Sequence, residues 1–189
     1  MKRRILFALI IPVALAVPPN ATSAPPQHPR LILNPERIAR LRLWTHPTGD
    51  PHDWTERERV MHLAYRSIVV AAEELCTRPP TGSWWGGTDC SDTGQQGGAF
   101  QGLTILAMAH LLRTGEPAYD ETKKYRTYTL ALLETWQQLG YPMWGRPCFC
   151  DLNTGELLAG WALAFDWLYT EMDSTQVRHN LDALSTLLA

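Results

Sequence analysis

The chain has 189 residues, of which 45% are hydrophobic and 19% charged, and its formal charge at neutral pH is −2. This is the composition of a globular protein, and the sequence has no basic patch or stripe of the kind that binds nucleic acid, so we expect no nucleic-acid partner. An acidic polysaccharide is not excluded, because a local cluster of Arg and Lys can reverse the field inside a cleft.

The N-terminus has the pattern of an export signal. Three basic residues at 2–4 precede an apolar run at 5–16 that is too short to span a bilayer comfortably, and Ala-Leu-Ala at 14–16 offers a cleavage site. We therefore expect an exported protein, periplasmic or extracellular, with a signal peptide at 1–16 and no membrane span after cleavage. An uncleaved N-terminal anchor is the alternative. Residues 17–29 hold five prolines and read as a tether.

We expect one domain at residues 30–189. Local start signals predict its first two helices. Asn34 is a good N-cap and Pro35 suits the first helical position, which predicts a helix over 35–44. Thr55 and Glu58 form a capping box at the start of a second helix. Its apolar residues recur with helical periodicity at Val60, Leu63, Ala64, Ile68, Ala71 and Leu75.

Two more helices are predicted in the middle of the chain. Residues 77–98 form a long loop with Trp84 and Trp85, and loops of this length in a compact domain are usually functional or disordered. Residues 99–113 then read as an almost wholly apolar helix. Pro117 opens an amphipathic helix that we expect to direct inward Tyr125, Tyr128, Leu132, Leu133, Trp136 and Leu139.

The stretch at 151–173, DLNTGELLAGWALAFDWLYTEMD, is the most informative in the chain. It follows a loop at 140–150 and predicts a helix that is apolar nearly all round, which belongs inside a layered helical structure. Its polar N-terminal end is where a helical barrel would keep a binding cleft. Asp173 and Gln176 then cap a last helix whose apolar face carries Val177, Leu181, Leu184 and Leu188.

The predicted elements are six helices with no convincing strand. Twice, an apolar helix is followed after a tight turn by an amphipathic one, and the two apolar helices begin roughly 53 residues apart, a spacing typical of helical repeats and barrels. We expect the apolar helices to form the inner layer and the amphipathic helices the outer layer.

The four cysteines are candidates for disulfide bonds. Cys76, Cys90, Cys148 and Cys150 form an even set in a chain predicted to be exported, which favours disulfides over metal. All three connectivities remain open. A zinc site is the alternative, but C-x-C beside an aspartate is not a standard zinc spacing, so we expect no metal and no other cofactor.

Three passages together resemble one known family. HPRLILNPERIARLR at 28–42 looks like the segment that opens its domain, LTILAMAHLLRTGEPAYDETKKY at 103–125 is similar to its helix hairpin, and GELLAGWALAFDWLYTEMDSTQ at 155–176 is similar to its aromatic helix and the next helix start. The chain thus resembles the N-terminal part of the heparinase II/III-like and alginate lyase superfamily. The resemblance implies an all-α fold, an incomplete (α/α) toroid of antiparallel helix hairpins.

The resemblance also implies a reaction. Such enzymes cleave uronic-acid polysaccharides, such as alginate or glycosaminoglycans, by β-elimination. Tyr and His are the usual acid and base, and the enzyme neutralises the carboxylate of the substrate uronate. The family's Asn-His motif does not occur in this chain. His179-Asn180 is the reverse order, and we expect it on a solvated face. The last helix has neither a glycine cap nor a polar stop, so we expect a truncated fragment that is inactive alone.

Each candidate substrate-binding residue could instead have a purely structural role. Trp84, Trp85 and Trp144 could stack on sugar rings or pack as lids over helix ends. Arg146 could pair with a uronate carboxylate, although a loop arginine is more often solvated. Asn153 and Glu156 could hydrogen-bond substrate hydroxyls or could simply form a capping box. No catalytic residue is assigned.

Two other functions remain open. An (α/α)-barrel glycoside hydrolase needs two carboxylates about 5–9.5 Å apart, and Asp151, Glu156 and Asp166 are the plausible inner-layer set. A non-catalytic helical module that binds glycans is the third possibility.

Overall fold

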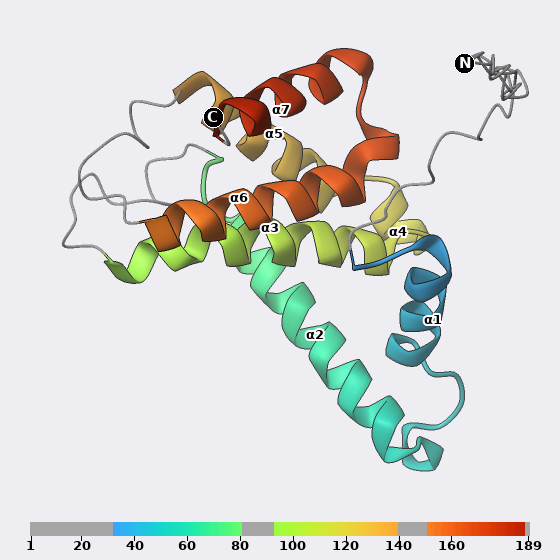
Figure 1. Ribbon diagram of the computed structural model, residues 1–189. Coiled ribbons are helices and arrows are strands. Elements are labelled where there is room, and N and C mark those ends of the chain that lie inside the picture. Colours follow the sequence, from blue (N-terminus) through green and yellow to red (C-terminus); the bar gives the residue numbers. More distant parts are fainter. Residues whose placement is uncertain (1–31, 81–92, 140–150, 188–189) are drawn as a thin grey trace, which may run out of the picture.

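The computed structural model describes residues 32–80, 93–139 and 151–187 of the chain (Figure 1). Every regular element in these residues is a helix, as the sequence predicts. The expected all-α class is therefore confirmed for this part of the chain.

The first two helices begin where their caps predict. Helix α1 (Pro35–Thr45) starts after Asn34, whose side chain accepts a hydrogen bond from the Arg37 backbone N–H at 2.8 Å. After a short 3₁₀ turn, η1 (Pro51–Asp53), helix α2 (Glu56–Cys76) starts with both halves of the Thr55–Glu58 capping box formed. These side chains satisfy N–H groups that a helix leaves unpaired in its first turn.

The middle of the chain differs from its prediction in two places. Helix α3 (Thr93–Arg113) begins six residues earlier than expected. The helix predicted from Pro117 is two helices, α4 (Pro117–Asp120) and α5 (Lys124–Leu139). The break falls at Lys123, which has a φ of +44° and donates its N–H to the Tyr119 carbonyl, the pattern of a left-handed helix terminus.

The C-terminal hairpin follows its prediction closely. Helix α6 (Asp151–Leu168) is prolonged by a 3₁₀ turn, η4 (Tyr169–Glu171), and α7 (Ser174–Leu187) follows. Asp173 caps α7 by accepting the Gln176 N–H at 2.8 Å, and the Gln176 side chain accepts the Asp173 N–H at 3.1 Å. This reciprocal cap fixes the tight turn between the two helices.

Helices α3 and α6 form the centre of the fold. They share the most extensive contact between any two elements described, and Figure 1 shows them side by side and running in the same direction. Helices α5 and α7 contact each other above this pair in the view, and α1 and α2 lie below it. The two apolar helices are therefore flanked by the amphipathic ones.

The core lies along α3 and α6, and its largest side chain, Trp161, forms a hydrogen bond. Trp161 is fully buried and donates its indole N–H to Asn180 Oδ1 at 2.7 Å. The expectation that Asn180 lies on a solvated face was wrong, because it is only 3% exposed, whereas His179 beside it is exposed. The indole needs an acceptor once it is buried, and α7 supplies one.

Helix α2 buries much less of its apolar surface than its periodicity suggests. Ala72 is its only fully buried residue, while Val60 and Leu63, from the predicted apolar face, are 56% and 64% exposed. Figure 1 shows the reason: the N-terminal half of α2 projects away from the α3–α6 pair, and α1 packs in the angle between them.

Among the described helices, none combines the length and the apolar character that crossing a bilayer requires.

Candidate functional site

Most of the predicted site residues fall outside the described parts of the chain. This holds for Trp84, Trp85, Trp144 and Arg146, and also for Cys90, Cys148 and Cys150. Cys76 ends α2, is half-buried and carries a free thiol in the structure. The stacking, uronate-pairing and disulfide predictions therefore stay predictions.

Asn153 and Glu156 lie in the first two turns of α6. Because α3 and α6 run side by side in the same direction, the starts of both helices lie at one end of the pair, on the left in Figure 1. The tight turn at 114–116 and η4 lie at the opposite end. The structure thus brings Asn153 and Glu156 to the same end as the start of α3.

The opposite end of the pair holds a set of charged side chains joined by hydrogen bonds and ion pairs. We call it the carboxylate cluster and define it by Glu73, Glu116 and Glu171, which come from α2, the turn after α3 and η4. Each carboxylate accepts hydrogen bonds from side chains of other elements. Tyr, His and Arg side chains surround the cluster, which makes it a candidate catalytic site.

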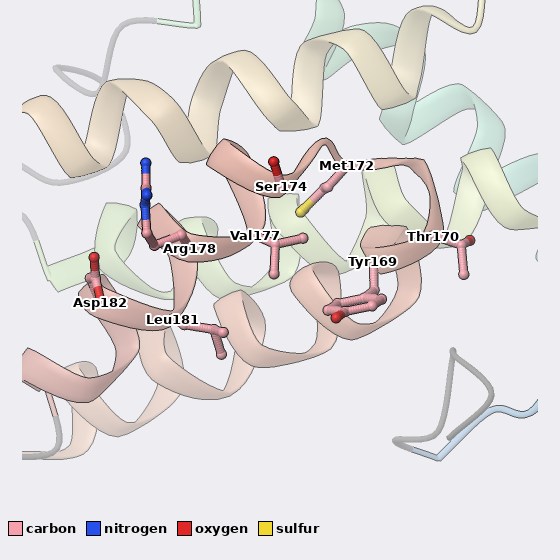
Figure 2. A pocket seen from close by; sticks show the side chains of 8 residues that line it. All are labelled: Tyr169, Thr170, Met172, Ser174, Val177, Arg178, Leu181 and Asp182. Carbon is pink, nitrogen blue, oxygen red and sulfur yellow. The ribbon is translucent and has the colours of Figure 1, made fainter. Parts of the chain in front are cut away.

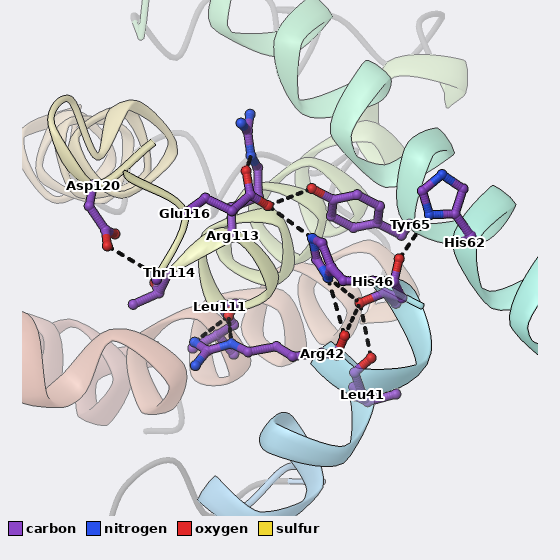
Figure 3. A network of polar contacts seen from close by, with 12 residues as sticks. Leu41, Arg42, His46, His62, Tyr65, Leu111, Arg113, Thr114, Glu116 and Asp120 are labelled. Atoms are coloured by element: carbon purple, nitrogen blue, oxygen red, sulfur yellow. Dashed lines mark hydrogen bonds and ion pairs between the residues drawn. The ribbon is translucent and has the colours of Figure 1, made fainter. Parts of the chain in front are cut away.

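Glu116 joins three elements, as Figure 3 shows. One of its oxygens lies 2.7 Å from the Tyr65 hydroxyl of α2 and 3.0 Å from His46 Nε2, just after α1. The other accepts from Arg113 Nε at 2.7 Å. Burial alone would raise the pKa of Glu116, but these three hydrogen bonds outweigh it and hold the pKa below its usual value.

Glu73 connects α2 to α5. Its carboxylate accepts from the Tyr125 hydroxyl and from Lys124 Nζ, and Arg113 lies 3.8 Å away. Burial opposes ionisation here too, yet the hydrogen bonds from Lys124 and Tyr125 lower the pKa of Glu73. Burial raises the pKa of Tyr125 to about 12, with help from Glu73, so this phenol stays protonated at neutral pH.

His110 and Glu171 connect α3 to the α6–α7 turn. The Glu171 carboxylate only accepts, so His110 Nε2 donates to it, and the other ring nitrogen lies 2.8 Å from the Tyr119 hydroxyl. The hydrogen bond from His110 lowers the pKa of Glu171, and nearby Lys123 and Arg126 add to the effect. His110 is completely buried and Tyr119 is 1% exposed.

The hydrogen bonds of the carboxylate cluster make it a structural junction between helices. A general acid or base must come within hydrogen-bond reach of its substrate, and buried His110 and Tyr119 do not meet that condition. Burial also raises the pKa of Tyr119, which opposes any role as a base. The cluster ties α1, α2, α3, α5 and η4 together at the tight-turn end, which sequence reasoning did not foresee.

Three pockets lined by described residues lie elsewhere. One, of about 510 Å³, lies between η4 and α7 (Figure 2) and has an apolar floor of Tyr169, Met172, Val177 and Leu181 with Arg178 and Asp182 at its rim. Two smaller ones lie between α5 and α7 and are lined mainly by polar side chains, including Glu134, Gln137 and His179. None of these three includes a residue of the carboxylate cluster.

Two kinds of site can be tested against the described residues. No group of three or more His, Cys, Asp or Glu side chains among them could hold a metal ion. Asp166 is 4% exposed and lies ten residues after Glu156 on α6, a rise of about 15 Å along the helix axis. A hydrolase pair needs about 5–9.5 Å, so Asp166 does not fit with Glu156 as such a pair.

Comparisons of the chain with protein-family profiles, with curated proteins and with solved structures gave no match.

Proposed function

We propose that this chain is the N-terminal part of an exported polysaccharide lyase, in which it forms part of an (α/α) toroid and one wall of the cleft for a uronic-acid polysaccharide. The proposal assigns this wall to the end of the α3–α6 pair where both helices begin. Binding of the glycan is the function assigned to these residues, and no catalytic acid or base is assigned.

One observation carries the proposal. Two apolar helices, α3 and α6, lie side by side and run in the same direction, and each is followed by a tight turn and an amphipathic helix. An inner layer of parallel helices with a returning outer layer is the arrangement that a toroid repeats. The carboxylate cluster fills the tight-turn end, which leaves the other end for a ligand.

The residues proposed for this wall suit a polyuronate. An arginine such as Arg146 can pair with a uronate carboxylate in a bidentate manner, and Trp84, Trp85 and Trp144 offer faces on which sugar rings can stack. Asn153 and Glu156 offer hydrogen bonds to sugar hydroxyls. In a lyase, neutralising the carboxylate makes the α proton easier to remove, because charge then develops on a compensated group.

Glycan binding by the full mature chain tests the proposal. We expect binding to alginate or a glycosaminoglycan in isothermal titration calorimetry, and much weaker binding to a neutral glucan. Arg146→Gln should weaken polyuronate binding about tenfold, the effect of losing one charge-assisted hydrogen bond. Arg40→Gln is the matched control, because Arg40 lies on α1 and, within the described ranges, pairs with exposed Glu36 alone, at 3.0 Å. Equal losses for both variants, or no polyuronate binding at all, would contradict the proposal.

The chemistry has its own readout. A lyase product carries an unsaturated uronate that absorbs in the ultraviolet, whereas a hydrolase releases a reducing sugar without that absorbance. Binding without either product favours a non-catalytic role for this chain. A second experiment adds a C-terminal segment that carries an Asn-His motif. If the chain is part of a lyase, this segment should restore turnover.

A further inference from the structure

The exposed side of α2 carries a heptad-like seam. Val60, Leu63, Ser67 and Val70 follow the 3-4-3 spacing of a and d positions in a coiled coil, and all four are exposed. Val60, Leu63 and Val70 account for three of the six large hydrophobic side chains exposed among the described residues. We call these four residues the α2 seam. Such a seam is the pattern that packs against another helix.

The charged residues beside the α2 seam indicate which helix packs against it. Arg59 lies at its N-terminal end and forms no ion pair among the described residues. Glu74 lies at its C-terminal end and is 71% exposed, with Arg78 of the same chain 3.5 Å from its carboxylate. A parallel pair of α2 helices would place Arg59 against Arg59 and Glu74 against Glu74. An antiparallel pair places Arg59 of each copy near Glu74 of the other, so the attraction occurs twice.

We propose that the α2 seam pairs with the same seam of a second copy of this chain, in an antiparallel arrangement with two-fold symmetry. Leu63 of one copy then lies beside Val70 of the other, and Ser67 lies near the symmetry axis, where a small side chain allows the helices to approach. The inference does not depend on the proposed polysaccharide function.

The position of the seam permits this pairing. The N-terminal half of α2 projects from the α3–α6 pair (Figure 1). The contacts of α2 with the end of α1 come from His62 and Tyr65, which lie on the face of α2 opposite the seam. All four seam residues are exposed, so a second helix can reach them. One helix of 21 residues gives a small interface, so a weak, concentration-dependent dimer in the micromolar range is expected rather than a permanent one. Arg66 lies near the middle of α2 at the edge of the seam, and its long side chain can keep its charge in water.

Analytical ultracentrifugation of the mature chain over a range of concentrations tests the pairing. We expect a monomer–dimer equilibrium in the wild type and at least a tenfold weaker association for Leu63→Arg, with Val70→Arg as an independent second variant. Because both side chains are exposed, circular dichroism and the melting curve at low concentration should not change. Leu43→Arg is the control, because Leu43 is 74% exposed on α1, outside the seam.

A charge-reversal cycle tests the orientation. Arg59→Glu and Glu74→Arg should each weaken the dimer, and the double variant should recover most of the loss, because the pairs re-form with opposite sign. A monomer at all concentrations, an association that Leu63→Arg leaves unchanged, or a double variant as weak as the sum of the singles would overturn the proposal. Association weakened equally by Leu43→Arg would indicate nonspecific aggregation and would overturn it as well.

Discussion

Helices α6 and α2 are both rich in apolar residues, yet they differ in how much of their apolar surface the fold buries. Most of the described C-terminal half of α6 is buried, with Trp161 and Leu168 at 0% exposure. Helix α2 exposes Val60, Leu63 and Val70 by more than half. The difference teaches that an apolar pattern predicts which face of a helix avoids water, but does not predict which element will cover that face.

The sharpest way to test this contrast is to remove the largest buried side chain of α6. Trp161→Ala should lower the free energy of unfolding by about 3–5 kcal/mol, because it leaves a cavity and removes the donor to Asn180. Urea denaturation followed by circular dichroism measures the loss. A cost below about 1 kcal/mol would mean that α6 is not the centre of the core.

Acid should produce the next largest effect, because it protonates all three members of the carboxylate cluster. Hydrogen bonds and nearby cations hold the pKa values of Glu73, Glu116 and Glu171 below the usual 4.5. A lowered folded-state pKa contributes stability that is complete above the unfolded-state pKa and is lost as pH falls through the folded-state value. The free energy of unfolding should therefore be flat near neutral pH and fall below about pH 4.5. Stability that rises on acidification would contradict this sign.

A single substitution in the carboxylate cluster should have a smaller effect. Glu116→Gln keeps the shape of the side chain but removes the charge that Tyr65, His46 and Arg113 contact, and should cost about 1–2 kcal/mol. It should also make the acid dependence shallower. Glu56→Gln is the matched control, because Glu56 is an exposed residue in the first turn of α2. Equal costs for the two variants would show that the cluster does not stabilise the junction.

The smallest effect is expected on the exposed side of α2. Leu63→Ala should change the stability of the monomer by less than about 0.5 kcal/mol, because the side chain is already 64% exposed. The comparison with Trp161→Ala must be made at low concentration, where any self-association is absent. A loss above about 2 kcal/mol would mean that the seam is covered within the monomer.

Local signals in the sequence placed most helix boundaries correctly. The caps at Asn34, Thr55 and Asp173 each depend on contacts between residues two or three positions apart, so they form wherever the chain folds. The turn at Gly115, with a φ of +100°, is equally local, because glycine adopts this conformation without steric cost. The break at Lys123 was missed because a lysine there carries no turn signal.

The sequence by itself determined the helical class, the caps and the presence of two apolar helices, because these follow from neighbours along the chain. Only the tertiary structure decided that Asn180 faces Trp161, that Glu73, Glu116 and Glu171 gather at one end of the fold, and that the α2 seam stays uncovered. The physical reason is that the partner of a polar or apolar side chain, which decides its role, lies up to about 70 residues away in the sequence, as in the contact between His46 and Glu116.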